Sequence, residues 1–524
     1  MANNNENKKG KVLIRVDGLK QYFPVKSTSF VQEKAFVKAN DNISIDIYEG
    51  ETLGLVGESG CGKSTLGRSI LQLYRQTDGR TMYYGRDIDD VAPKYVLDIL
   101  SNLVSKRKTL DKLRQKEAQL RAAYEAMPES DVKYKELEKL QAAEKEARDL
   151  FMDIVQLIGG FFVADDLTQI SEILVKEYKT GVELRRLKNK LHEDKIALDG
   201  KISILKEKGN SSAEIDEKTG SDRQKLKQAE EKIQQKENEL KAIRDDIYKL
   251  MEQYKKHPDF EKYEVYRDKG INLARLTDEE MRVLRRDLQL IFQDPYSSLN
   301  PRMTVGQIIS EGLLAHKFFS AHDEKMQDYI LEVMEKCGLA PYFINRYPHQ
   351  FSGGQRQRIG IARSLALQPK FVVCDEAVSA LDVSIQSQII NLLLDLKEQQ
   401  NLTYLFISHD LSVIKYISDR VCVMYLGNVM ELADTQELFD NPTHPYTEAL
   451  LSAIPTTDVD NKKEVILLEG DIPSPINPPT GCKFHTRCKY ATDICKKITP
   501  ELEEISPGHF VACHHKLDKG KNKE

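Results

Sequence analysis

The sequence predicts an α/β fold organised around a parallel sheet, with an all-α insertion and a small cysteine-containing extension near the C-terminal end. Three observations carry this prediction. A glycine-rich segment stands between a short apolar run and a helical pattern, a long stretch of charged heptads follows, and four cysteines cluster late in the chain. Short apolar runs that end in polar residues come after the heptads, which is typical of buried parallel strands.

Size and composition indicate a globular protein without a bias toward nucleic acids. The 524 residues suggest about three domains, and the net charge of −5 gives no electrostatic case for a nucleic-acid partner. No apolar run reaches the roughly 18 residues that cross a bilayer. Residues 1–11 lack the apolar core of a secretory signal. We therefore expect a cytosolic protein that reaches a membrane only through a partner.

The glycine-rich segment Gly57–Thr65 reads Gly-Glu-Ser-Gly-Cys-Gly-Lys-Ser-Thr. It fits the pattern G-x-x-x-x-G-K-[ST] of a phosphate-binding loop. The apolar run Thr52–Val56 before it predicts a strand, and Thr65–Tyr74 predicts a helix whose N-terminus attracts anions. In such a loop Lys63 reaches the β- and γ-phosphates and Ser64 ligates Mg²⁺. We therefore expect this chain to bind a nucleotide.

Further strands and one helix follow from the apolar pattern on both sides of the heptads. Alternation predicts the N-terminal strands, and continuous apolar runs predict buried ones. A helix is expected over Ser384–Gln399. The predicted strands are Val12–Val16, Ile43–Ile47, Thr81–Tyr84, Leu288–Phe292, Phe371–Cys374 and Thr403–Ile407, with a hairpin of Val421–Tyr425 and Asn428–Leu432.

The insertion, residues 91–275, is rich in Lys, Glu, Gln and Leu at heptad spacing, which is typical of coiled coils. One seam runs from Leu226 to Tyr254 with a single polar break at Lys236. We expect about four long helices that fold back as antiparallel neighbours, the last of them roughly 50 Å long. The expected breaks lie near Pro128, near Gly159–Gly160 and at a polar loop over residues 209–221.

Residues 151–163 form an apolar patch inside this charged region. One hypothesis is a docking tip that touches a membrane surface or a partner. The other is a small core where the helical hairpins meet. The second is favoured because helical bundles must bury their apolar faces.

Five polar segments complete a pattern that begins with the phosphate loop. Each is weak alone, because a glutamine, a turn or a histidine at the end of a strand is common. Ligands of open α/β sheets bind at the carboxyl ends of the strands, which is where these segments lie. In chain order they are Gln293, Ser352-Gly353-Gly354-Gln355, Asp375-Glu376, Ser379-Ala380-Leu381-Asp382 and His409.

In this order the segments closely resemble the ATP-binding cassette (ABC) family of transporter ATPases, over the whole chain except the insertion and the two tails. The resemblance implies an ABC-type P-loop NTPase core with a helical subdomain, which binds ATP and Mg²⁺ and transfers a phosphoryl group by positioning and charge stabilisation. It implies that Asp375 holds Mg²⁺ through water, with Gln293 and Ser64 also at the metal. Glu376 is the implied general base, and His409 is the implied switch histidine at the γ-phosphate.

The resemblance also assigns nucleotide contacts. Phe23, or its neighbour Tyr22, would stack on adenine, and the signature 352–355 would face the nucleotide of an opposite subunit, so that ATP joins two cassettes. One departure is Ala377, where many relatives have proline. The implied nucleotide-binding residues on the loop and motifs are Gly57, Ser59, Gly60, Cys61, Gly62, Lys63, Ser64, Thr65, Gln293, Ser352, Gly353, Gly354, Gln355, Asp375 and Asp382.

Four further segments resemble the oligopeptide/dipeptide importers, in particular their second ATPase subunit. The resemblance implies ATP-driven import of peptides, by a protein peripheral to the cytoplasmic face of a bacterial cell membrane. Its partners would be a second, different ATPase, two transmembrane permeases and, indirectly, an extracellular binding protein. Importers of nickel or another small solute are the alternative. The segments are Asp294–Pro301, Arg346–His349, His444–Thr447 and Pro473–Pro479.

A rival hypothesis is a soluble SMC-like coiled-coil ATPase, a class that acts on chromosomes. In that class the coiled coil lies between the Q-loop glutamine and the signature. Here the heptads precede Gln293, and the interval from Gln293 to Ser352 is of ordinary transporter length. The order of segments therefore favours a transporter.

Four cysteines, Cys482, Cys488, Cys495 and Cys513, are spaced C-x5-C-x6-C-x17-C. In a reducing cytosol such a group suggests metal rather than disulfides. The tight C-x2-C pairs of most zinc sites are missing. The same quartet occurs in importer relatives, some of which carry a [4Fe–4S] cluster, so we expect the cluster in preference to zinc or to unligated thiols.

The domain organisation follows from these changes of composition. We expect a disordered tail (1–11), a first part of the nucleotide-binding core (12–90), the helical coiled-coil insertion (91–275), a second part with the signature subdomain (276–433), the importer-type extension with the four cysteines (434–515) and a charged tail (516–524).

Overall fold

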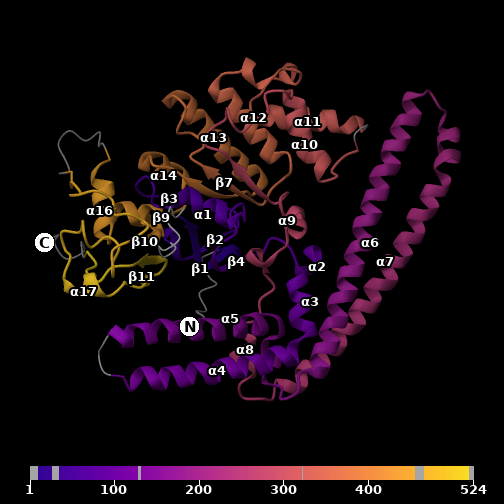
Figure 1. Ribbon diagram of the computed structural model, residues 1–524. Coiled ribbons are helices and arrows are strands. Elements are labelled where there is room, and N and C mark those ends of the chain that lie inside the picture. Colours follow the sequence, from indigo (N-terminus) through magenta and orange to yellow (C-terminus); the bar gives the residue numbers. More distant parts are fainter. Residues whose placement is uncertain (1–9, 26–34, 128–130, 321–322, 455–464, 518–524) are drawn as a thin grey trace. The chain divides into compact units, whose positions relative to one another are not determined.

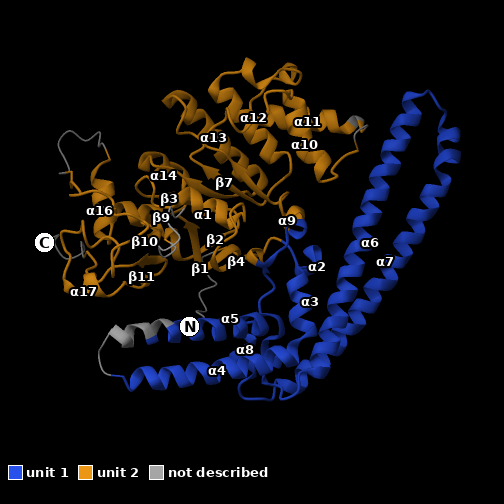
Figure 2. Cartoon of the chain, in the orientation of Figure 1, with its two compact units in different colours: residues 1–4, 86–271, 275–280 blue, residues 5–85, 272–274, 281–524 orange. Residues whose placement is uncertain are grey.

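The computed structural model describes residues 10–25, 35–127, 131–320, 323–454 and 465–517. The chain forms two compact units, which Figure 2 distinguishes by colour. Unit 1 contains residues 86–271 and 275–280, and unit 2 contains the described residues up to 85, residues 272–274 and those from 281 onward. The predicted break at Pro128 and most of both predicted tails lie outside the described residues.

The described strands form two sheets (Figure 1), and all their residues belong to unit 2 except Ile271. The first has the order β2-β1-β4-β5, and β1 pairs antiparallel with both β2 and β4. Its strands are β1 (Val12–Pro24), β2 (Phe36–Tyr48), β4 (Asp78–Tyr83) and β5 (Ile271–Asn272).

The second sheet has the order β11-β12-β10-β9-β3-β8-β7-β6. Strands β6, β7, β8, β3 and β9 run parallel, and the hairpin of β9 and β10 turns at Leu426-Gly427 as predicted. All the strands expected from the sequence are present. The strands are β3 (Thr52–Val56), β6 (Leu288–Ile291), β7 (Phe371–Asp375), β8 (Thr403–Ile407), β9 (Arg420–Tyr425), β10 (Asn428–Asp434), β11 (Glu503–Ser506) and β12 (His509–Val511).

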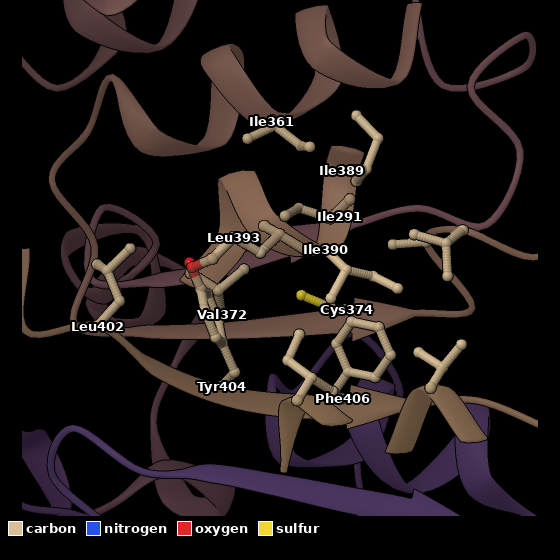
Figure 3. Packing of buried hydrophobic residues seen from close by; sticks show 14 of the residues in the cluster. Ile291, Ile361, Val372, Cys374, Ile389, Ile390, Leu393, Leu402, Tyr404 and Phe406 are labelled. Atoms are coloured by element: carbon tan, nitrogen blue, oxygen red, sulfur yellow. The ribbon is translucent and has the colours of Figure 1, made fainter. Parts of the chain in front are cut away.

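Strands β3, β7 and β8 are buried on both faces, which explains their continuous apolar sequences. Figure 3 shows one side of this core, where Cys374 of β7 and Phe406 of β8 lie beneath Ile389, Ile390 and Leu393. These three residues belong to α13 (Val383–Gln400), which the sequence predicted within one residue at each end. Because these strands run parallel, their carboxyl ends lie at one edge of the sheet.

The helix after the phosphate loop, α1 (Lys63–Ile70), begins two residues earlier and ends four residues earlier than predicted. It begins early because Gly62 takes a left-handed conformation and serves as its N-cap. The other helices of unit 2 are α9 (Asp278–Leu284), α10 (Val305–Ala315), α11 (Glu324–Lys336), α12 (Gly353–Leu365), α14 (Leu411–Ile417), α15 (Thr435–Asp440), α16 (Pro445–Ser452) and α17 (Asp493–Lys497), with 3-10 turns at Leu273–Arg275, Pro341–Phe343 and Pro348–Gln350.

Unit 1 contains the four long helices that the heptads predicted, and α4 packs on α5 while α6 packs on α7. A polar loop predicted over residues 209–221 is wrong, because α7 already begins at Ser212. Ser211 and Glu214 form a reciprocal capping box there, and Ile215 is buried. The helices are α2 (Ile88–Val91), α3 (Lys94–Ser101), α4 (Leu103–Glu125), α5 (Asp131–Ile158), η1 (Gly159–Val163), α6 (Thr168–Glu207), α7 (Ser212–Tyr254) and α8 (Phe260–Glu264).

The apolar patch 151–163 is a small core and not a docking tip. Phe161 and Phe162 are 0% and 1% exposed. The Phe162 ring packs on Tyr263 at a centroid distance of 4.8 Å, and the Arg107 guanidinium lies 3.8 Å from its centre. The docking hypothesis is wrong because aromatic and basic side chains of unit 1 cover this patch from several helices.

The seam of α6 and α7 is apolar with one polar step. Ile233 and Leu240 of α7 pack with Leu184 of α6. Lys236, the predicted break, ion-pairs with Glu183 of α6 at 2.7 Å. The polar residue in the seam, Lys236, is therefore paired with an acidic side chain on the neighbouring helix.

Candidate nucleotide site

The phosphate loop between β3 and α1 is closed around the ammonium group of Lys63. Its Nζ atom donates to the carbonyl oxygens of Gly57 at 2.7 Å and Glu58 at 3.1 Å, and the side chain is buried. Loop amides at the start of a helix and a lysine ammonium form the donor set that phosphate oxygens require. A bound phosphate could therefore replace the carbonyl oxygens of Gly57 and Glu58 as the hydrogen-bond partner of Lys63.

Two glycines of the loop are fixed by the strands beside them. A Cβ atom on Gly62, whose φ is 99°, would lie 2.1 Å from the carbonyl oxygen of Ala39 on β2. One on Gly57 would lie 2.2 Å from the carbonyl oxygen of Met424 on β9. No side chain fits at either position, so the backbone of the loop is set by its neighbours as well as by its own sequence.

Asp375, the last residue of β7, has a buried carboxylate that could bind a cation. It is 1% exposed, and Oδ2 accepts a hydrogen bond from Arg68 of α1 at 3.0 Å. Among the described residues, nothing donates to Oδ1. A buried carboxylate oxygen without a donor is costly, whereas Mg²⁺ binds such oxygens directly or through water. Asp375 therefore fits the Mg²⁺ role that the resemblance implies.

Glu376, Gln293 and His409 meet at the ends of the neighbouring strands β7, β6 and β8. Gln293 Nε2 donates to Glu376 Oε2 at 2.7 Å, and His409 Nδ1 lies 3.7 Å from the same oxygen. Glu376 has a φ of 48°, and its N–H donates to Ile407 at 3.1 Å. The structure thus brings together three predicted residues, a carboxylate, an amide and an imidazole, which can orient a water molecule and take its proton.

The signature segment lies apart from this group. Ser352 caps α12 in a reciprocal box with Gln355, and the Cα of Gly354 faces Ile385 of α13. Asp382 caps α13, and the hydrogen bond from Ile385 N–H lowers the pKa of its carboxyl. In the described part of the chain, no hydrogen bond links residues 352–355 to the phosphate loop or to Glu376. Among the described residues, the signature segment and the group of Glu376, Gln293 and His409 therefore share no hydrogen bond.

The two aromatic candidates lie on β1, which pairs with β2 next to the loop. Tyr22 donates to Asp41 at 2.6 Å, and burial together with this hydrogen bond raises its pKa. The ring of Phe23 packs edge-on against Tyr74 at 5.3 Å. From β2, Asn40 Nδ2 donates to the carbonyl of Gly62 at 3.1 Å. Both rings therefore belong to the structural surroundings of the loop, and their contact with adenine stays a prediction.

Two residues of the C-terminal extension contact the phosphate loop, and the sequence did not predict either contact. Tyr446 of α16 accepts the N–H of Glu58 on its hydroxyl at 2.9 Å. Arg487, between two of the cysteines, donates to both carboxylate oxygens of Glu58 at 2.7 and 3.2 Å. The only sequence signal was the motif His444–Thr447, which contains Tyr446 but does not name its partner.

The four cysteines converge in this extension. Cys482 and Cys495 are buried, while Cys488 and Cys513 are half-buried. The N–H of Cys482 donates to the carbonyl of Cys495 at 2.8 Å. Burial, and then the other three cysteines, raise the pKa of Cys513 to about 12. Within the described ranges, no three His, Cys, Asp or Glu residues are placed to hold one metal ion.

None of the helices in the described ranges combines the length and the apolar character needed to cross a membrane.

Two family models match this chain. The model for "ABC transporter" matches residues 40–265 and 260–379. The model for "Oligopeptide/dipeptide transporter, C-terminal region" matches residues 430–495, which include Tyr446, Arg487 and three of the four cysteines.

Curated relatives agree with these models. The oligopeptide transport ATP-binding protein AppF of Bacillus subtilis is 55% identical over 249 residues, which are 47% of this chain and 75% of AppF. OppF of Haemophilus influenzae, with the same description, is 51% identical over 248 residues, 47% of this chain and 74% of OppF. A solved dimeric bacterial ABC transporter cassette is 16% identical over 81% of this chain and 99% of its own, with a TM-score of 0.41.

Proposed function

This chain belongs to the ABC transporter family of ATP-binding proteins, and from that premise we propose that it is the ATPase that drives an importer of oligopeptides. The match of residues 430–495 to the C-terminal region of oligopeptide/dipeptide transporters carries the proposal. Relatives that are 51–55% identical and are called oligopeptide transport ATP-binding proteins support it. They do not favour a nickel or other small-solute importer, or an SMC-like ATPase.

We propose that the loop and Asp375 hold the nucleotide. Lys63 would leave the carbonyls of Gly57 and Glu58 for the β- and γ-phosphates, while the loop amides through Thr65 surround the phosphate oxygens. Asp375 would use its free Oδ1 to hold Mg²⁺ through water, together with Ser64. Mg²⁺ supplies neutralisation of the charge that develops on the phosphates.

Glu376 would act as the general base. The 2.7 Å hydrogen bond from Gln293 fixes its carboxylate, so that the carboxylate can take the proton of an attacking water. The His409 side chain, whose Nδ1 atom lies 3.7 Å from the same oxygen, would contact the γ-phosphate. Glu376 takes this position directly after β7 with a left-handed φ of 48°, while its N–H donates to the carbonyl of Ile407 on β8.

The signature would serve a nucleotide bound by a second ATPase. Its N-cap at Ser352 starts α12, whose first amides favour an anion. Within the described ranges it makes no hydrogen bond to Glu376, Gln293 or His409. We propose a different ATPase as this partner, with two permeases and, indirectly, an extracellular binding protein completing the importer. The complex would lie at the cytoplasmic face of a bacterial cell membrane.

For the four cysteines we propose a [4Fe–4S] cluster. A zinc ion needs four ligands about 2.0–2.3 Å from one point, and the described residues offer no such group. An iron–sulfur cluster takes one cysteine on each iron, and the spacing C-x5-C-x6-C-x17-C supplies four cysteines in one short segment. The cluster would brace the extension.

We propose that α6 and α7 form an antiparallel coiled coil within an insertion that is separate from the catalytic chemistry. The apolar seam and the Lys236–Glu183 pair support this proposal. Deleting residues 92–272 and joining the ends by a short linker tests the role of the insertion. Unchanged transport would show that it is dispensable.

Three measurements test the main proposal. Purification from native membranes should recover permeases, a second ATPase and a lipid-anchored binding protein, and a gene deletion should abolish uptake of labelled oligopeptides. Glu376→Gln should not restore uptake and should lower ATP hydrolysis by about 10²–10⁴-fold, while exposed Glu398→Gln restores both. Peptide uptake that survives the deletion would refute peptide import, and wild-type hydrolysis by Glu376→Gln would refute the assignment of the base.

A further inference from the structure

Glu58 is bound from both sides of the phosphate loop. On the inner side, its carbonyl oxygen accepts hydrogen bonds from Lys63 Nζ at 3.1 Å and from Cys61 N–H at 3.2 Å. On the outer side, its N–H donates to Tyr446, and its carboxylate is held by Arg487. The residue that holds the phosphate-binding lysine is therefore itself held by the C-terminal extension.

The pair of Arg487 and Glu58 is built to fix a position. Two guanidinium nitrogens meet two carboxylate oxygens, and this parallel geometry restricts both distance and direction. The Arg487 side chain is 7% exposed, and that of Glu58 is 25% exposed. A mostly buried charge pair of this kind leaves an uncompensated charge when one partner is removed.

Aromatic packing joins the cysteine segment to the same point. The rings of Tyr425 on β9, Tyr446 on α16 and Phe484 lie 4.9 to 5.3 Å apart in all three pairs. The N–H of Arg487 donates to the carbonyl of Phe484 at 3.0 Å, within the turn from Cys482 to Cys488. The path of this turn therefore determines where both Phe484 and the Arg487 guanidinium lie.

We propose that Arg487 and Tyr446 are positioning residues for the phosphate loop, and that the four-cysteine segment thereby sets the nucleotide affinity of the site. They would act by holding Glu58 so that Lys63 and the loop amides keep the spacing of a phosphate. The inference goes beyond the proposed import function and does not depend on the transported solute.

The first test measures the dissociation constant of a fluorescent ATP analogue with the full-length protein. Arg487→Gln and Tyr446→Phe should each weaken binding by about 5- to 20-fold, the lower part of the range of typical couplings between sites. The double variant Glu58→Gln/Arg487→Gln should bind the analogue no more weakly than Arg487→Gln alone, since both substitutions remove the same interaction. Lys489→Gln is the control, because Lys489 lies in the same segment but pairs with Glu448.

Stability measured without nucleotide separates positioning from folding. Tyr446→Phe removes one oxygen and keeps the ring, so its melting temperature should fall only by the small amount that one lost hydrogen bond costs, while the variant binds the analogue more weakly. Unchanged affinity in both Tyr446→Phe and Arg487→Gln would overturn the proposal. A double variant that binds more weakly than Arg487→Gln, or an equal loss of affinity in Lys489→Gln, would also overturn it.

A second comparison tests the link to the cysteines. Cys488→Ala should weaken binding of the analogue in the wild-type background and have no further effect in the Arg487→Gln background. Equal weakening in both backgrounds, or none in the first, would show that the cysteine segment does not act through Arg487. This readout is nucleotide affinity, so it is independent of whether peptides are transported.

Discussion

Replacing Glu431 by Gln tests the buried charge that fastens the C-terminal extension to the large sheet. Glu431 lies on β10 and is 0% exposed. Its Oε1 accepts from Thr443 N–H at 2.8 Å and from His509 Nε2 at 2.7 Å, and its Oε2 accepts from His444 N–H at 3.0 Å. Three donors, from the start of α16 and from β12, thus converge on one carboxylate.

The expected cost follows from this geometry. A glutamine keeps one oxygen, for Thr443 and His509, and presents an amide group to His444 N–H, which is left as an unsatisfied buried donor at about 1–3 kcal/mol. The hydrogen bond from His509 also loses its charged acceptor, which removes roughly another 1 kcal/mol. The free energy of unfolding should therefore fall by about 2–4 kcal/mol.

The loss should depend on pH. Burial lowers the pKa of His509, but the hydrogen bond and charge of Glu431, and then of Glu437, outweigh it, so that the pKa lies above its ordinary value of 6.5. The stabilisation is complete below the unfolded pKa and is lost as pH rises through the raised folded pKa. The cost of Glu431→Gln should thus be larger near pH 6 than near pH 9.

Urea unfolding followed by circular dichroism at both pH values measures this difference, and hydrogen exchange over β10 and β12 locates it. Glu437→Gln is the matched control, because Glu437 is 44% exposed and lies 3.5 Å from His509 Nδ1. Its cost should be about 0–1 kcal/mol. A loss for Glu431→Gln no larger than that of the control, or one that grows with pH, would contradict a buried Glu431 carboxylate that stabilises protonated His509.

Three further variants test other parts of the molecule. Gly62→Ala should abolish binding of an ATP analogue at unchanged circular dichroism, because its Cβ would meet the Ala39 backbone; retained binding would contradict the loop geometry. Phe162→Ala should cost about 3–5 kcal/mol in urea unfolding of unit 1, against roughly 0.5 kcal/mol or less for exposed Tyr248→Ala; equal costs would contradict a buried ring. Leu393→Ala should lower the urea midpoint by the equivalent of about 2–5 kcal/mol, and an unchanged midpoint would contradict the core of Figure 3.

Local sequence predicted the parts of the fold and site that are determined locally. A few consecutive residues are enough to predict each of these features: the phosphate loop, the strand ends at Asp375 and Glu376, and the buried strands β7 and β8. The sequence also predicted that Asp375 and Glu376 lie near Gln293 and His409, because the carboxyl ends of parallel strands lie at the same edge of a sheet.

Contacts between distant segments could not be predicted in the same way. Nothing near Arg487 indicates that its partner is Glu58, and nothing near Arg68 indicates Asp375, since each pair is formed only when the sheet and extension are assembled. The start of α7 was missed for a different reason. The polar run before it resembled a loop, but Ser211 with Glu214 forms a capping box, and that signal outweighs polarity.

The backbone at Glu376 has a consequence for how this protein can evolve or be engineered. A left-handed conformation costs an ordinary residue about 1–2 kcal/mol, and glycine adopts it freely. Selection for stability alone would therefore favour glycine at this position, whereas the general-base role proposed for Glu376 would retain the glutamate. Thermostable variants of this protein should therefore gain their stability at other positions. At residue 376, the backbone conformation favours glycine for stability, while the proposed catalytic role favours glutamate.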